Sequence, residues 1–198
     1  MLYLNQYDYP HIPYEHYTEY GGAPEDRRNV AAAGCGLCCL CMIVNHLTSE
    51  TLEITECVRL SETSGANGGR GTRIHVLGPI IAEMYHLEYR TTNDIQELLQ
   101  HLHSGGEAIA NVGGDYDGHI GIFSHKGHFI VITSANENTV CVLDPSFKEG
   151  KYEEEGRSDK VFIQMPFLYC SSQNLAADVL TRDPSFYLFK RIDKTTIV

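Results

Sequence analysis

The chain has 198 residues, of which 42% are hydrophobic and 21% charged, which fits one globular domain over residues 1–198 and argues against a long disordered region. Its formal net charge is −11 and its longest basic run is one Arg–Arg pair, which argues against a nucleic-acid-binding protein. Nowhere do about 18 apolar residues run together, and the N-terminus has no basic start, so we expect a cytoplasmic protein without a membrane anchor or signal peptide.

The first half of the chain predicts mainly helices. Residues 1–30 are rich in Tyr and Pro, which is typical of extended chain and loops. From Cys35 to about Leu47, apolar residues recur at every third or fourth position, which predicts a helix with one buried face. Four further elements are predicted: a helix over 49–60, a helix capped by Thr72 and reaching about His86, a strand over 87–90, and a helix over 94–103 capped by Thr92 or Asn93.

The second half of the chain changes to the pattern of β-strands. Strands are predicted over 107–112, 128–134, 139–144, 160–167 and 185–191. Residues 135–138 have turn chemistry, so the second and third of these strands form a hairpin. An acidic loop covers 148–159, and its part over 152–159 is interpreted as solvated, with a role in choosing basic substrates as the alternative. Helices first and an antiparallel sheet second are typical of the α+β class.

Seven cysteines occur, four of them within residues 35–41. An odd count in a reducing compartment argues against a disulfide framework. A zinc site would need a fourth ligand and a second short chelating pair, and the sequence has no second Cys-x-x-Cys. Cys38, Cys39 and Cys41 are therefore interpreted as small apolar core residues, with a structural zinc site as the alternative.

Cys35 differs from its neighbours because it lies between two glycines where the helix should begin. The positive end of the helix dipole favours a thiolate there. Its own backbone N–H is one of the unpaired donors of the first turn, so it is able to face a developing oxyanion. The flanking glycines are expected to let a substrate backbone come close. Cys35 is thus the candidate nucleophile.

A nucleophilic cysteine needs a histidine base and an acceptor that orients the histidine. His128 opens one strand of the predicted hairpin and Asp144 closes the other, sixteen residues later. The two side chains should therefore lie at the same end of the sheet. His125 is the alternative base, although it precedes the strand. The glycine loop over 113–121 carries Asp115, Asp117 and His119 and is interpreted as a loop at the rim of the cleft, with calcium or zinc binding as the alternative.

The motifs "GCGLCCLCM", "GHFIVIT" and "VLDPS", in that order, resemble the papain-like cysteine peptidases related to bacteriocin-processing (double-glycine leader) peptidases, the peptidase C39-like group. The resemblance covers residues 2–150 and extends more loosely to 190. It implies an α+β papain-like fold, with the nucleophile helix packed on an antiparallel sheet. It also implies Cys35 as nucleophile, His128 as general base and acid, Asp144 as the residue that orients the histidine, and no cofactor.

The same resemblance implies a glutamine before the cysteine that completes the oxyanion hole. Gln6, in "LNQYDYP", matches that residue, although the 29 positions to Cys35 are more than is typical of the family. Asn29 is the alternative donor. Leu37 is a further departure, because many relatives have proline there.

The predicted reaction is hydrolysis of a peptide or other amide through a thioester on the cysteine. Two alternatives keep the same fold: a transpeptidase or other acyltransferase, as in phytochelatin-synthase-like enzymes, and a non-catalytic peptide-binding module.

Overall fold

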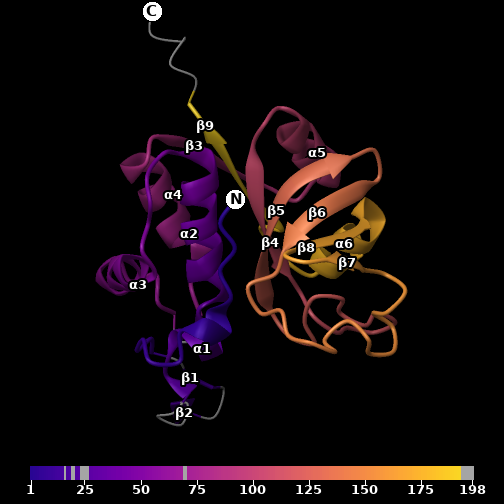
Figure 1. Ribbon diagram of the computed structural model, residues 1–198, viewed down its shortest axis with the longest axis horizontal. Coiled ribbons are helices and arrows are strands. Elements are labelled where there is room, and N and C mark those ends of the chain that lie inside the picture. Colours follow the sequence, from indigo (N-terminus) through magenta and orange to yellow (C-terminus); the bar gives the residue numbers. More distant parts are fainter. Residues whose placement is uncertain (16, 19–20, 23–26, 69–70, 193–198) are drawn as a thin grey trace, which may run out of the picture.

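The computed structural model places one antiparallel sheet between two groups of helices (Figure 1). It describes residues 1–15, 17–18, 21–22, 27–68 and 71–192. Helices α2, α3 and α4 cover one face of the sheet, and α5 and α6 lie on the other (Figure 1). Within the described residues, no helix has the length and apolar character needed to cross a membrane.

The N-terminal part holds most of the helices. Its elements are η1 (Gln6–Asp8), the short strands β1 (Tyr17–Thr18) and β2 (Gly21–Gly22), α1 (Val30–Ala33), α2 (Cys35–Leu47), α3 (Ile54–Thr63) and α4 (Ile74–Met84). The helix predicted from Cys35 to Leu47 is confirmed. The cap predicted at Thr72 is wrong: Arg73 precedes α4 without a side-chain cap, and the Thr72 hydroxyl is bonded to the Tyr14 hydroxyl at 2.8 Å instead.

The sheet has seven strands in the order β3-β9-β4-β5-β6-β8-β7, and every neighbouring pair is antiparallel. In chain order its strands are β3 (Leu87–Thr92), β4 (Glu107–Val112), β5 (His128–Asn136), β6 (Thr139–Leu143), β7 (Phe162–Gln164), β8 (Phe167–Ser171) and β9 (Phe186–Arg191). Helices α5 (Ile95–His103) and α6 (Ser172–Val179) complete the fold.

Both faces of the sheet are covered, and alternate side chains of each central strand enter different cores. In β4, Ile109 packs with the helices α2 to α4, whereas Ala108 and Ala110 pack with α5 and α6. Burial on both faces explains why the central strands are apolar almost throughout rather than strictly alternating. The α+β prediction is confirmed, with the sheet positioned directly behind α2.

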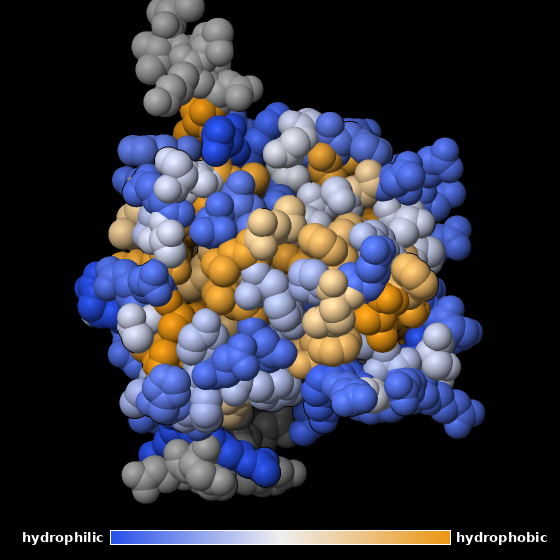
Figure 2. Space-filling model, viewed as in Figure 1, coloured by the Kyte–Doolittle hydropathy of each residue, from blue (hydrophilic) through white to orange (hydrophobic). Residues whose placement is uncertain are grey.

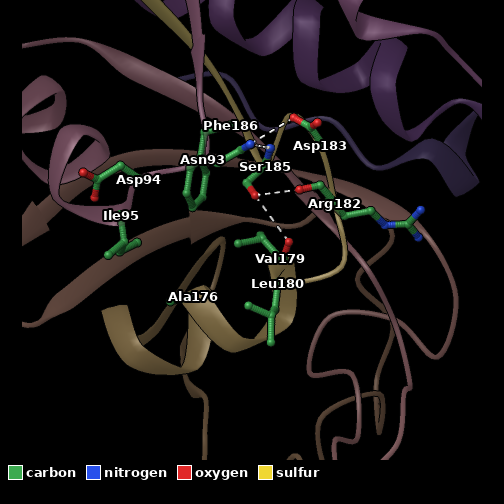
Figure 3. Close-up of a pocket in the computed structure, with 10 residues that line it drawn as sticks. All are labelled: Asn93, Asp94, Ile95, Ala176, Val179, Leu180, Arg182, Asp183, Ser185 and Phe186. Carbon is green, nitrogen blue, oxygen red and sulfur yellow. Dashed lines mark hydrogen bonds between the residues drawn. The ribbon is translucent and has the colours of Figure 1, made fainter.

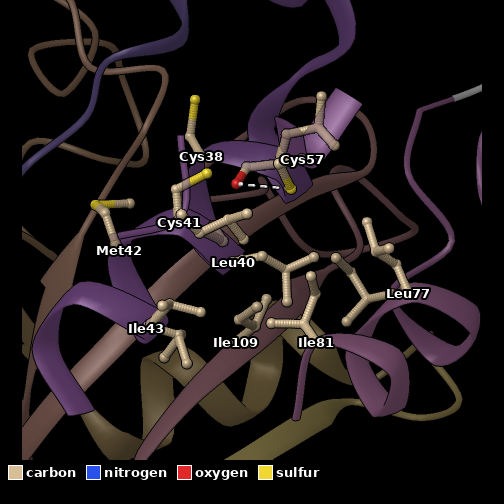
Figure 4. Close-up of a cluster of buried hydrophobic side chains, with 14 of the residues drawn as sticks. Cys38, Leu40, Cys41, Met42, Ile43, Cys57, Leu77, Ile81 and Ile109 are labelled. Carbon is tan, nitrogen blue, oxygen red and sulfur yellow. Dashed lines mark hydrogen bonds between the residues drawn. The ribbon is translucent and has the colours of Figure 1, made fainter. Parts of the chain in front are cut away.

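Helix α2 is the centre of the larger core (Figure 4). Cys38, Cys39 and Cys41 are fully buried there among leucine and isoleucine side chains, and all seven cysteines of the chain are free. The interpretation of these three cysteines as core residues is confirmed. A search of the described residues for three or more His, Cys, Asp or Glu side chains able to hold a metal ion finds none.

The surface is hydrophilic along the margins of the face shown in Figure 2, and apolar residues gather along the line between the helical layer and the sheet. The start of α2 and the end of β6 lie at the same end of the molecule, the lower end in Figure 1. Cys35, the first residue of α2, and Asp144, the residue after β6, therefore both lie at this end.

Candidate active site

The turn before α2 presents Cys35. Asn29 caps α1, its side-chain oxygen accepting the Ala32 N–H at 3.0 Å, and Gly34 separates α1 from α2. The first hydrogen bond of α2 runs from the Cys38 N–H to the Gly34 carbonyl at 3.0 Å. The Cys35 N–H therefore belongs to the first-turn amides that have no acceptor within the helix. Cys35 is partly exposed, whereas the other six cysteines are buried.

The two glycines beside Cys35 serve close packing inside the protein. A Cβ on Gly34 would lie 2.4 Å from Val30 Cγ1, and one on Gly36 would lie 2.9 Å from Thr72 Cβ. Real Cβ atoms do not approach other atoms this closely. The prediction that these glycines open a path for a substrate backbone is therefore wrong, since protein atoms fill the space beside both of them.

His128 and Asp144 meet at the end of the β5–β6 hairpin. The pairing of Val131 with Leu143 confirms the predicted hairpin and brings the start of β5 beside the residues that follow β6. The His128 Nε2–H donates to Asp144 Oδ1 at 2.7 Å, and the Ser146 hydroxyl lies 3.0 Å from the same nitrogen. His128 and Asp144 are both buried.

The His128 ring lies beside the Cys35 side chain, close enough for each group to shift the pKa of the other. Since Nε2 faces Asp144, Nδ1 is the ring nitrogen left for the thiol. Burial raises the pKa of Cys35, but the charge and hydrogen bond of His128 and the amides of Phe129 and Gly36 outweigh it, so the pKa lies below its ordinary value. Burial lowers the pKa of His128, but the Cys35 thiolate and Asp144 raise it to about 9. Both shifts favour the charged forms of the pair, the thiolate and the imidazolium.

Asp144 is held from all sides. Its Oδ2 accepts the Lys151 ammonium at 2.6 Å and the Tyr152 hydroxyl at 2.7 Å, and its Oδ1 accepts the Ser146 N–H at 2.9 Å in addition to His128. Burial raises the pKa of Asp144, but its hydrogen bonds and ion pairs with His128 and Lys151 hold it well below its usual range. Asp144 is therefore a carboxylate at neutral pH.

Lys151 and Tyr152 were not predicted as site residues, because they lie in the acidic loop over 148–159. The interpretation of 152–159 as solvated is wrong for Tyr152 and Arg157, which are buried, as is Lys151 just before them. The Arg157 Nε–H donates to the Gly121 carbonyl at 2.8 Å and ties the segment to the domain. The signal available in the sequence is faint, a Lys–Tyr pair just before a run of three glutamates.

Gln6 lies beside this cluster. Its backbone N–H donates to the Pro145 carbonyl at 2.7 Å, and its side-chain Nε2–H donates to the Ala31 carbonyl at 2.7 Å. One Nε2 hydrogen remains, and the buried Oε1 has no partner among the described residues. Burial raises the pKa of Tyr7, the next residue, and the nearby charges of Asp144 and Cys35 raise it further. The alternative donor, Asn29, is engaged as the cap of α1.

The remaining candidates lie away from Cys35. His125 is exposed and pairs with Asp115 at 2.9 Å and with Glu154 at 2.8 Å, so it does not face the thiol. In the glycine loop over 113–121, His119 pairs with the buried Asp178 at 2.9 Å. These contacts link the loop to the rest of the domain.

A separate hollow lies between the start of α5, the end of α6 and β9 (Figure 3). Asn93 is one of its lining residues, and its side chain donates to Asp183 at 2.9 Å and accepts from the Ser185 N–H at 2.7 Å. None of the four predicted site residues lines it.

Comparison with known proteins identifies the family and the fold. Residues 27–159 match the sequence model of the Peptidase C39 family. A crystal structure of a protein from Bacillus anthracis, described as a C39-like peptidase, superposes with a TM-score of 0.59 and covers 98% of this chain and 96% of that one. Its 11% sequence identity makes this a likeness of fold alone, and it confirms the predicted papain-like fold. No curated protein matches the chain significantly.

Proposed function

Because the chain belongs to the Peptidase C39 family, we propose that it is a cysteine peptidase whose catalytic triad is Cys35, His128 and Asp144. The observation that carries the proposal is the position of His128, which lies beside the Cys35 thiol and donates to the buried Asp144 carboxylate at 2.7 Å. This is the arrangement that activates a thiol and keeps the histidine in the useful tautomer. Peptides are the substrate class that the family implies.

In the first half of the reaction, the Cys35 thiolate attacks the carbonyl carbon of a peptide bond and forms a C–S bond. The carbonyl oxygen becomes an oxyanion, and the Cys35 N–H and the remaining Nε2 hydrogen of Gln6 donate to it. His128 gives its Nδ1 proton to the leaving amine as the C–N bond breaks. A thioester on Cys35 and a neutral His128 result.

In the second half, His128 Nδ1 accepts a proton from a water molecule whose oxygen attacks the thioester carbon. The C–S bond then breaks, the carboxylic acid product leaves, and the thiolate–imidazolium pair is restored. Asp144 remains ionised throughout and acts through the Nε2–H, which holds the ring with Nδ1 directed at the sulfur.

The test is cleavage of a mixed-sequence peptide library, read by mass spectrometry, with wild-type protein and two single variants. Cys35→Ala should abolish cleavage, whereas Cys38→Ala, one helical turn further along α2, should keep it. Cleavage by Cys35→Ala at the wild-type rate would refute the proposal. Repeating the assay with an added amine separates hydrolysis from acyl transfer, since a transferase would yield the new amide in place of the free acid.

A further inference from the structure

A buried lysine stands on the far side of Asp144 from the histidine. The Lys151 ammonium donates to Asp144 Oδ2 at 2.6 Å and to the Ser146 hydroxyl at 2.7 Å, and its side chain is only 8% exposed. Burying an ammonium group costs its hydration, so a buried lysine needs a close counter-charge. Asp144 is that counter-charge, and the triad as described above makes no use of the lysine.

The two oxygens of Asp144 are divided between the two cations. Oδ1 accepts from His128, whereas Oδ2 accepts from Lys151 and from the Tyr152 hydroxyl. The carboxylate cannot turn away from His128 without breaking its contacts with Lys151. The lysine therefore fixes the orientation of the group that orients the histidine.

The lysine also balances charge. With the thiolate and imidazolium formed, Cys35 and Asp144 carry two negative charges, and His128 and Lys151 carry two positive ones. The titratable groups near Asp144 are His128 on β5, Cys39 on α2, Tyr3 and Tyr7 in the N-terminal segment, and Lys151 and Tyr152 after β6. Lys151 itself also faces Arg157 and Cys35. Removing the ammonium would leave the three remaining groups, Cys35, Asp144 and His128, with a net negative charge.

We propose that Lys151 is a positioning residue of the active site, which locks the Asp144 carboxylate toward His128 and balances its charge so that the Cys35 thiolate forms in more acidic solution. The proposal rests on the proposed function, because it takes Cys35 and His128 as the reacting pair. It adds a fourth residue to the triad, one that acts through Asp144 and does not touch the substrate.

The test measures the rate at which iodoacetamide alkylates Cys35 as a function of pH, which requires no substrate. In Lys151→Met the midpoint of the rising limb should move up by about half a unit to one unit, because the thiolate loses a nearby cation. At a fixed pH on that limb, the rate should fall by about threefold to tenfold. Lys151→Arg, which keeps the charge, should stay close to wild type. Lys148→Met removes an exposed lysine of the same loop and should leave the midpoint unchanged.

A second variant covers the case in which Lys151→Met does not fold. Lys151→Gln removes the charge but keeps a group able to donate to Asp144, and its midpoint should also move up. Folding of each variant is checked by thermal melting. An unchanged midpoint in Lys151→Met or in Lys151→Gln would overturn the proposal and leave Lys151 with a structural role. Slow alkylation of Cys35 in the wild type would instead count against the proposed function.

Discussion

Two buried histidine–carboxylate pairs lie near opposite ends of α2, and they differ in what the second ring nitrogen of each histidine faces. His128 meets Asp144 at 2.7 Å beside the start of the helix, and His46, in its last turn, meets Glu107 at 2.9 Å. The second nitrogen of His128 faces the thiol of Cys35, whereas Nε2 of His46 donates to the Leu2 carbonyl at 2.7 Å. In the proposed mechanism the first pair moves a proton onto the substrate, whereas the second clamps the N-terminal segment to the domain.

The two carboxylates also differ in ionisation. Burial raises the pKa of Asp144, but the hydrogen bonds and charges of His128 and Lys151 hold it well below the usual range. Among the described residues, the Glu107 carboxylate is hydrogen-bonded by His46 alone, and burial raises the pKa of Glu107 even though His46 opposes the shift. Asp144 therefore differs from Glu107 in having a second cationic partner, Lys151, beside its histidine.

The largest expected effect is the loss of His128. His128→Ala should lower kcat by at least about 10⁴-fold, because no other group can pass the proton to the leaving amine. Asp144→Asn should cost less, since the asparagine keeps the shape of the side chain and the histidine retains its contact with the thiol. Peptide cleavage measures both. His125→Ala is the matched control and should stay near wild type; if it were the inactivating change, the assignment of the base would be wrong.

How far the sequence predicts this site depends on the range of the contacts. Cys35, His128 and Asp144 could be placed because each stands where a regular element begins or ends, and a two-strand hairpin fixes the distance between the last two. Lys151 is buried in a segment that is tied down by the hydrogen bond from Arg157 to the Gly121 carbonyl. This is a contact between two irregular loops, and the spacing of apolar residues in the sequence does not predict it.

The fold shows the same limit. Strand β4 matches its predicted range, because both its faces are buried and its apolar run is uninterrupted. The segment predicted as one strand over 160–167 is a hairpin of β7 and β8, since Pro166 has no N–H to donate to a ladder. Helix α6 was not predicted; its eight residues are too few and too polar to show a clear helical period.

The second expected effect concerns the oxyanion. Gln6→Ala should lower kcat by about a hundredfold to a thousandfold, because one of two donors to the oxyanion is lost. The fold should persist, since the Gln6 backbone N–H still donates to Pro145, and Cys35 should still be alkylated. Asn29→Ala is the control: losing the cap of α1 should cost about 1 kcal/mol of stability with a smaller effect on kcat. The reverse result would assign the donor role to Asn29.

The smallest expected effect tests the clamp at the other end of α2. A carboxyl group whose pKa is raised by folding holds its proton more tightly in the folded state, so it stabilises the fold below its ordinary pKa of about 4.3. That contribution is lost as the pH rises through the raised value of Glu107. Glu107→Gln cannot lose a proton, so its Tm relative to wild type should increase as the pH rises from 4 to 7. The increase should be about 2–4 °C, which corresponds to roughly 1 kcal/mol in a chain of this size. Thermal melts across that interval measure it, with exposed Glu88→Gln as the control. A Tm difference that does not vary with pH would show that Glu107 is held as an anion after all, and the two carboxylates would then differ only in what lies on the far side of their histidines.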